Sequence, residues 1–167
     1  MRWLFRDGAD WNEALPIHNK YMDIANYESE YMSSMLAMLE MVKNGTTAFL
    51  ESGGIINTDA AAEAAIDIGI RTFLGDAFVR DQDAYGVPVA REEKDRVYAL
   101  LGTELARNKS ENDLVQAVIT LSGMGKASDE LLLKAKELAD THDVILNMHQ
   151  SYQEDDYLED NNRLGMP

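Results

Sequence analysis

A repeated alternation between helical and short apolar stretches constrains the fold of this chain more than any other feature. Each helical stretch has apolar side chains on one face, and each is followed by a mostly apolar run that ends at a polar residue. The expected helices span residues 28–43, 60–68, 92–109 and 129–142, and the expected strands span residues 46–51, 70–75, 114–121 and 144–149. This alternation is typical of a parallel sheet with right-handed crossovers, so the sequence predicts an α/β fold.

About four parallel strands with flanking helices are compatible with two architectures. One is a small doubly wound sheet. The other is half of an eight-stranded (β/α)8 barrel of the TIM type, which usually needs ~250 residues. The 167 residues are enough for a single domain with its own core, and the pattern alone leaves both architectures open.

The last apolar run ends at His149, which is followed by polar residues. In parallel sheets, ligands and chemistry lie just beyond the carboxyl ends of the strands. A neutral imidazole at that place can bind a transition metal or move a proton, and the alternative is an ordinary histidine with a hydrogen-bond partner. Glu51 ends an earlier run, before Gly53 and Gly54, and is either a site residue or a loop carboxylate that faces water.

Composition and charge exclude several classes of partner. The formal net charge of −15 argues against nucleic acid and against anionic membrane surfaces. No apolar run approaches the ~20 residues that span a bilayer. There is no cysteine, so neither a disulfide nor a thiolate metal site is available. Because the N-terminal residues lack the pattern of a signal peptide, we expect a cytoplasmic protein.

The two ends of the chain are less regular. Residues 1–27 carry Pro16, and their sequence predicts a loop with short helical pieces. Residues 153–167 are acidic but lack the spaced ligands of a calcium loop, so they predict a solvated charged segment. Within the chain, Thr58 or Asp59 is expected to cap the second helix and Ser128 the fourth.

Three segments carry a resemblance to a known family. They are residues 40–49 (EMVKNGTTAF), residues 64–72 (AAIDIGIRT), and the unit from Ser128-Asp129-Glu130 through Glu137-Leu138-Ala139 to Asn147-Met148-His149. In order and spacing they resemble the amidohydrolase superfamily, in particular its branch of cytosine, guanine and S-adenosylhomocysteine deaminases and triazine hydrolases. The match extends over most of the chain.

The resemblance implies a metal-dependent (β/α)8 hydrolase, with residues 1–167 a fragment of its single domain. Members use a divalent metal, often zinc or iron, to activate water for attack on a ring or amide carbon. The implied function is hydrolysis of a C–N or related bond in a small cyclic molecule, and the implied partner is that substrate, with a homo-oligomer also compatible. His149 corresponds to the metal ligand of the family's fifth strand.

The chain also departs from the family pattern. It has no His-x-His pair of the kind found on the family's first strand, and it reaches Pro167 before the family's later histidine and aspartate. The deaminases carry a catalytic glutamate three residues after the fifth-strand histidine, where this chain has Tyr152. We expect Glu51 and Tyr152 to contact substrate, identify no catalytic residue, and expect the isolated chain to be inactive. The alternative function is a non-catalytic α/β binding module or an inactive relic.

Overall fold

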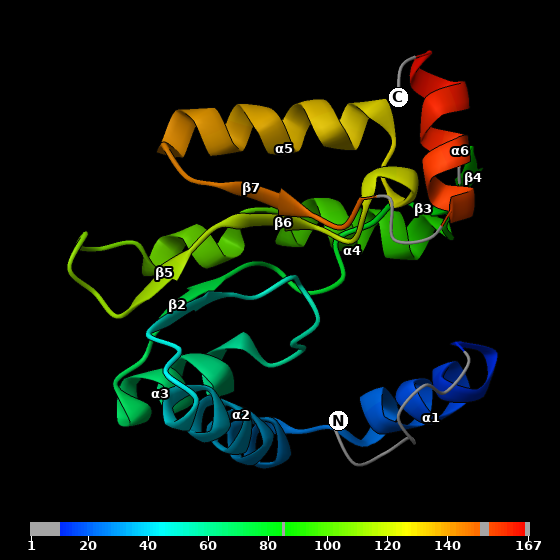
Figure 1. Ribbon diagram of the computed structural model, residues 1–167. Coiled ribbons are helices and arrows are strands. Elements are labelled where there is room, and N and C mark those ends of the chain that lie inside the picture. The colour runs from blue at the N-terminus through cyan, green and yellow to red at the C-terminus, as the bar shows by residue number, and fades with distance from the viewer. Residues whose placement is uncertain (1–10, 85, 151–153, 166–167) are drawn as a thin grey trace.

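Two short parallel sheets form the centre of the fold (Figure 1). The computed structural model describes residues 11–84, 86–150 and 154–165. One sheet has the order β1-β2-β5 and the other pairs β6 with β7, all in parallel. The strands are β1 (Ala48–Leu50), β2 (Arg71–Leu74), β5 (Val115–Ala117), β6 (Ile119–Leu121) and β7 (Leu146–Met148). Their order in space follows their order in the chain, which confirms the predicted α/β class with parallel strands.

The sequence predicts one strand over residues 114–121, but the structure breaks it at Val118. The N–H of Val118 still donates to the carbonyl of Leu74 in β2, at 2.8 Å. Beside β5, the Asn108 side chain takes the place of a neighbouring strand: its amide donates to the Ala117 carbonyl at 2.9 Å, and its oxygen accepts from the Ala117 N–H at 2.6 Å. The two halves of the predicted strand therefore pair with different neighbours, β5 with β2 and β6 with β7. The Asn108 side chain makes the hydrogen bonds with Ala117 that a further strand beside β5 would otherwise make.

Helices cover the sheets in two layers (Figure 1). The helices α2 (Tyr27–Lys43) and α3 (Thr58–Ile68) pack against each other and against the sheet of β1, β2 and β5. The helices α4 (Arg91–Leu100) and α5 (Asp129–His142) pack against β6 and β7. Fully buried alanines such as Ala61 and Ala64 let α3 approach its neighbours closely.

Each layer has its own hydrophobic cluster, and the two clusters share no residue. The cluster under α2 and α3 is centred on Met38, Ile70 and Leu74. The cluster under α4 and α5 contains Val97 and Leu131 together with Ile119 and Leu121 of β6. Each of the two sheets thus has its own core, and the break at Val118 separates them.

Helix caps agree only partly with the sequence prediction. The predicted Ser128 cap of α5 is confirmed, since its hydroxyl oxygen accepts from the Leu131 N–H at 3.2 Å. The prediction of Thr58 or Asp59 as the cap of α3 is wrong. The cap is Asn57, whose side-chain oxygen accepts from the Ala60 N–H at 3.4 Å. Asparagine is also a favoured cap, and Asn57 lies one residue before the earlier of the two predicted positions.

The predicted helix over residues 92–109 is interrupted. It ends as α4 at Leu100, and a 3-10 helix, η1 (Thr103–Arg107), follows. Between them, Gly102 adopts a left-handed conformation with φ of 85°, which glycine enters without a steric penalty. The long loop before α4 also contains a small antiparallel pair, β3 (Gln82–Ala84) and β4 (Val87–Pro88).

Both ends of the described chain are more helical than predicted. A single helix, α1 (Trp11–Ile24), includes Pro16 and lies apart from both layers (Figure 1). The acidic tail forms α6 (Glu154–Leu164), which packs on the 3-10 helix η2 (Met124–Lys126). Arg163 anchors α6 there by donating to the Met124 and Ala127 carbonyls, both at 3.4 Å. Within the described residues, no helix combines the length and apolarity needed to cross a membrane.

Candidate functional site

The carboxyl ends of the parallel strands meet at one edge, which we call the strand-end edge. The residues that follow the strands there are Glu51 after β1, Gly75 and Asp76 after β2, Ser122 after β6 and His149 after β7. Backbone hydrogen bonds connect the loops that begin at this edge. The Phe78 N–H donates to the Gly53 carbonyl at 2.9 Å, and the Met124 N–H donates to the His149 carbonyl at 3.1 Å. The strand ends therefore form one continuous surface.

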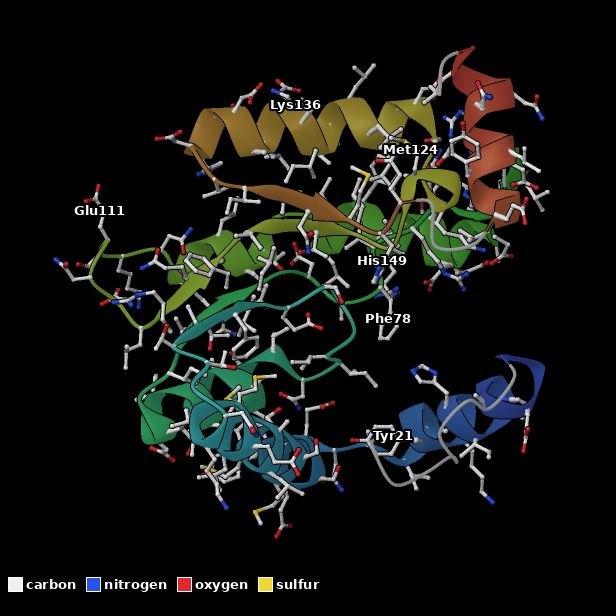
Figure 2. All side chains as sticks on the ribbon, viewed as in Figure 1. Tyr21, Phe78, Glu111, Met124, Lys136 and His149 are labelled. Carbon is white, nitrogen blue, oxygen red and sulfur yellow. The ribbon has the colours of Figure 1, made fainter. Side chains whose placement is uncertain are left out.

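His149 is exposed at the strand-end edge, where the sequence places it (Figure 2). Its backbone lies close to Gly123, because a Cβ built on Gly123 would be 3.3 Å from the His149 carbonyl oxygen. Phe78 lies at the same end of the strands in Figure 2, and the ring of His18 from α1 meets it edge-on at 6.3 Å. An exposed imidazole in this position presents nitrogen atoms that can bind a metal or exchange a proton.

Glu51 is held at the same edge by its own loop. Its carboxylate oxygens accept from the Gly53 N–H at 2.6 Å and from the Gly54 N–H at 2.8 Å. Its carbonyl accepts from the side-chain amide of Asn147, at 3.4 Å. An ionised carboxylate can accept about four hydrogen bonds, so Glu51 keeps acceptor capacity for a further donor. The third predicted site residue, Tyr152, lies outside the described residues.

Asp76 is a buried carboxylate that the sequence analysis did not single out. It is 3% exposed, and it accepts from the Gly102 N–H at 2.7 Å, the Thr103 hydroxyl at 2.7 Å and the Glu104 N–H at 3.3 Å. Burial raises the pKa of Asp76, although the hydrogen bonds that it accepts act in the opposite direction. Its bonds hold η1 against the end of β2, so Asp76 supports the edge from inside.

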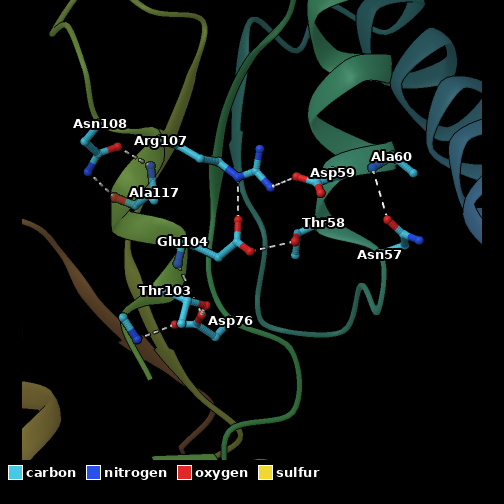
Figure 3. Close-up of polar contacts among 11 residues, drawn as sticks. Asn57, Thr58, Asp59, Ala60, Asp76, Thr103, Glu104, Arg107, Asn108 and Ala117 are labelled. Carbon is cyan, nitrogen blue, oxygen red and sulfur yellow. Dashed lines mark hydrogen bonds and ion pairs between the residues drawn. The ribbon is translucent and has the colours of Figure 1, made fainter. Parts of the chain in front are cut away.

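The contacts of Asp76 continue toward α3 (Figure 3). Glu104 accepts from the Thr58 hydroxyl at 2.7 Å. Arg107 forms ion pairs with both Glu104 and Asp59. This chain of polar groups joins the end of β2 to the first turn of α3.

A hollow of about 720 Å³ is lined in part by members of this polar chain, namely Asp59, Glu104 and Arg107. Its walls come from α3, η1 and residues 109–115, and they include Arg107 and Lys109. Neither Glu51 nor His149 lines it. The hollow is therefore separate from the strand-end edge.

The described part of the chain contains no group of three or more His, Asp or Glu side chains that could hold a metal ion. Of the predicted site residues that the structure describes, His149 is the one predicted to bind metal. A catalytic zinc site usually takes three protein ligands and a water molecule, so the described residues do not complete such a site.

Comparison with known proteins identifies a family and a fold. The sequence profile of the amidohydrolase family matches residues 3–165. A 5-methylthioadenosine/S-adenosylhomocysteine deaminase of Thermodesulfovibrio yellowstonii is 31% identical over 116 residues, covering 70% of this chain and 25% of that protein. A 5'-deoxyadenosine deaminase of Methanosphaera stadtmanae is 32% identical over 124 residues, covering 72% of this chain and 27% of that protein. The chain therefore spans about a quarter of the length of these two relatives.

The fold also matches a solved structure. An adenosine deaminase of Xanthomonas campestris, solved with bound zinc, aligns with a TM-score of 0.72 at 18% sequence identity. The alignment covers 96% of this chain and 35% of that chain. At this identity the likeness concerns the fold, and it extends over nearly all of the chain.

Proposed function

Because this chain belongs to the amidohydrolase family, we propose that it is part of a metal-dependent hydrolase. In this proposal residues 1–167 contribute about four strands to a single (β/α)8 barrel domain. The sequential order of the parallel strands supports it, since neighbouring strands of such a barrel are also neighbours in the chain. The relatives, with about four times the matched length, have room for the remaining strands.

The observation that carries the proposal is the position of His149 directly after β7, exposed at the strand-end edge. Active sites of (β/α)8 enzymes lie at this edge of the barrel. We propose that His149 contributes one ligand to a divalent metal, zinc or iron. An imidazole nitrogen suits both metals, and the zinc in the solved adenosine deaminase supports zinc in the family. The other ligands would have to come from outside the described residues.

The proposed reaction is hydrolysis of a C–N bond in a small cyclic molecule. The two relatives are named as deaminases of 5-methylthioadenosine, S-adenosylhomocysteine and 5'-deoxyadenosine. In hydrolytic deamination, water adds to the ring carbon that carries the amine, and ammonia leaves. Glu51 is proposed to accept a hydrogen bond from the substrate with the acceptor capacity that Gly53 and Gly54 leave. Tyr152 is proposed as a second substrate contact.

Ammonia release tests the proposed function. The protein made from the complete reading frame, loaded with zinc or iron, is assayed with 5'-deoxyadenosine, 5-methylthioadenosine, S-adenosylhomocysteine and guanine. His149→Ala should lower kcat/KM by more than about 100-fold, because losing even a group that only supports a metal ligand costs 10–100-fold. His142→Ala is the matched control, since His142 is also exposed but lies in the last turn of α5. The absence of ammonia from every substrate, or full activity of His149→Ala, would refute the proposal.

Zinc binding by the 167-residue chain is a separate test of the incomplete ligand set. We expect weak binding in calorimetry, because the described residues contain no group of three ligands of the kind that a catalytic site usually needs. Tight one-to-one binding that is lost in His149→Ala and kept in His142→Ala would show that these 167 residues hold a complete site.

A further inference from the structure

Asn147 occupies a central position below the strand-end edge. It is the middle residue of β7, and His149 follows two residues later, just past the end of that strand; residues two apart along an extended chain share a face. It is also the register partner of Thr120 in β6, so the side chains of Asn147 and Thr120 lie on the same face of the sheet. The face that leads to His149 therefore carries two polar side chains inside otherwise apolar strands.

The side chain of Asn147 reaches from the sheet of β6 and β7 to the sheet of β1, β2 and β5. Its amide donates to the Glu51 carbonyl at 3.4 Å, although β1 and β7 are the first and the last of the parallel strands in space. This contact joins the two strands that carry the two described candidate site residues, Glu51 and His149.

Two glycines make this close approach possible. A Cβ on Gly53 would lie 2.8 Å from the Cγ2 of Thr120, and a Cβ on Gly75 would lie 2.0 Å from the Thr120 Oγ1. Real Cβ atoms do not approach other atoms this closely, so any larger residue would push β6 away from the ends of β1 and β2. At this level the ends of the two sheets are thus close enough for a single asparagine side chain to connect them.

Glu51 is consequently held from two directions. The Gly53 and Gly54 amides fix its carboxylate, and the Asn147 amide contacts its carbonyl. We propose that Asn147 is a positioning residue, which fixes Glu51 of the β1 end relative to His149 of the β7 end. The hydrogen bond between Asn147 and Glu51 is a feature of the structure itself. The importance of Asn147 for a reaction rests on the proposed function.

Amide hydrogen exchange in the metal-free 167-residue chain tests the contact. In Asn147→Ala, exchange of the Gly53 and Gly54 amides should become about fivefold faster, the factor that corresponds to a hydrogen bond of ~1 kcal/mol. Asn147→Asp has nearly the same shape but replaces the donor by an acceptor, so it should accelerate the same amides at least as much. Asn112→Ala, at an exposed asparagine in the loop before β5, is the control and should leave them unchanged.

Amides of α5 serve as the reference for global stability in each variant. Unchanged Gly53 and Gly54 exchange in both Asn147 variants would overturn the proposal. Acceleration of equal size at Gly53, Gly54 and α5 would also overturn it, because that result describes a general loss of stability.

The complete enzyme separates this proposal from the proposed function. There, Asn147→Ala should lower kcat about fivefold or more while the bound metal content stays as in the wild type, in contrast to His149→Ala, which should lose metal. If the wild type has no activity but Gly53 and Gly54 exchange faster in the Asn147 variants, the proposed function fails and the positioning contact stands. If activity is present and Asn147→Ala changes neither kcat nor exchange, the positioning role fails and the proposed function stands.

Discussion

Substitution of Gly75 by alanine tests the tight approach of β6 to the end of β2. The backbone of Gly75 lies outside the left-handed region, so alanine can adopt its conformation without strain. The added Cβ would lie 2.0 Å from the Oγ1, 2.4 Å from the Cβ and 3.3 Å from the backbone N of Thr120. A rotamer change of Thr120 moves Oγ1 but not Cβ, so the strands themselves must separate.

The size of the effect follows from two opposing terms. Overpacking a close-packed region costs about 1–3 kcal/mol, and a clash with an atom fixed to the backbone belongs at or above the upper limit. Replacing glycine by alanine returns about 0.4–1 kcal/mol by restricting the unfolded chain. We therefore expect Gly75→Ala to lower the free energy of unfolding by about 2–3 kcal/mol. With a urea m-value of about 1–3 kcal/mol/M, the midpoint should fall by about 1 M or more.

Two further variants make this prediction specific. Gly54→Ala is the matched control, since its added Cβ would meet only the Glu51 Oε1, at 3.4 Å, and its stability should change by less than about 1 kcal/mol. Thr120→Gly removes both clashing side-chain atoms, so it should relieve most of the cost of Gly75→Ala in a double-mutant cycle. If Gly75→Ala unfolds at the same urea concentration as Gly54→Ala, or shows no coupling to Thr120→Gly, the described approach of β6 to β2 is wrong.

Three other predictions concern groups that shape the fold. Asn108→Ala should cost about 2–4 kcal/mol in urea unfolding, because it removes both hydrogen-bond partners of buried Ala117, whereas exposed Asn112→Ala should cost less than about 0.5 kcal/mol. Asn26→Ala should cost about 1 kcal/mol in thermal unfolding, since Asn26 forms a capping box with Ser29 at the start of α2; a change below 0.3 kcal/mol would contradict this. Burial raises the pKa of Asp76, so the folded state binds its proton more tightly than the unfolded state does. The stability of the wild type relative to Asp76→Asn should therefore fall as the pH rises from about 4 through the raised pKa, and a pH-independent difference would contradict the assignment.

The regular elements follow from local pattern, and their interruptions follow from distant contacts. The helices α2, α3 and α5 and the strands β1, β2 and β7 match the predicted elements to within a few residues, because apolar periodicity reflects which face is buried. The interruptions have partners elsewhere: Asn108 satisfies the edge of β5, and Asp76 binds Gly102, 26 positions along the chain. Such contacts leave no periodic signal in the sequence.

The residues of the candidate site also fall into two groups: those that a local sequence pattern marks, and those that a distant contact places. Glu51 and His149 were identifiable because a polar residue at the end of an apolar run marks a strand end in a parallel sheet. Asn147 was not, since its partner Glu51 is 96 positions away. The available signal was the presence of an amide side chain within the apolar run from Val144 to Met148, where a buried polar group needs a partner.

Polar contacts and the close packing of Thr120 against Gly53 and Gly75, rather than a shared hydrophobic cluster, connect the two layers of this protein. The hydrophobic cluster under α2 and α3 and the cluster under α4 and α5 have no residue in common. Between them lie the contacts of Asp76 with Gly102 and Thr103, of Glu104 with Thr58, and of Asn147 with Glu51.

These contacts decide the geometry of the strand-end edge, because Glu51 follows a strand of the first layer and His149 follows a strand of the second. Hydrogen bonds depend steeply on distance and angle, whereas apolar contact is non-directional. A conservative change in one of the connecting polar groups can therefore displace Glu51 relative to His149 while both cores remain packed. Substitutions inside either core should instead lower stability first, and alter the edge only when that layer unfolds.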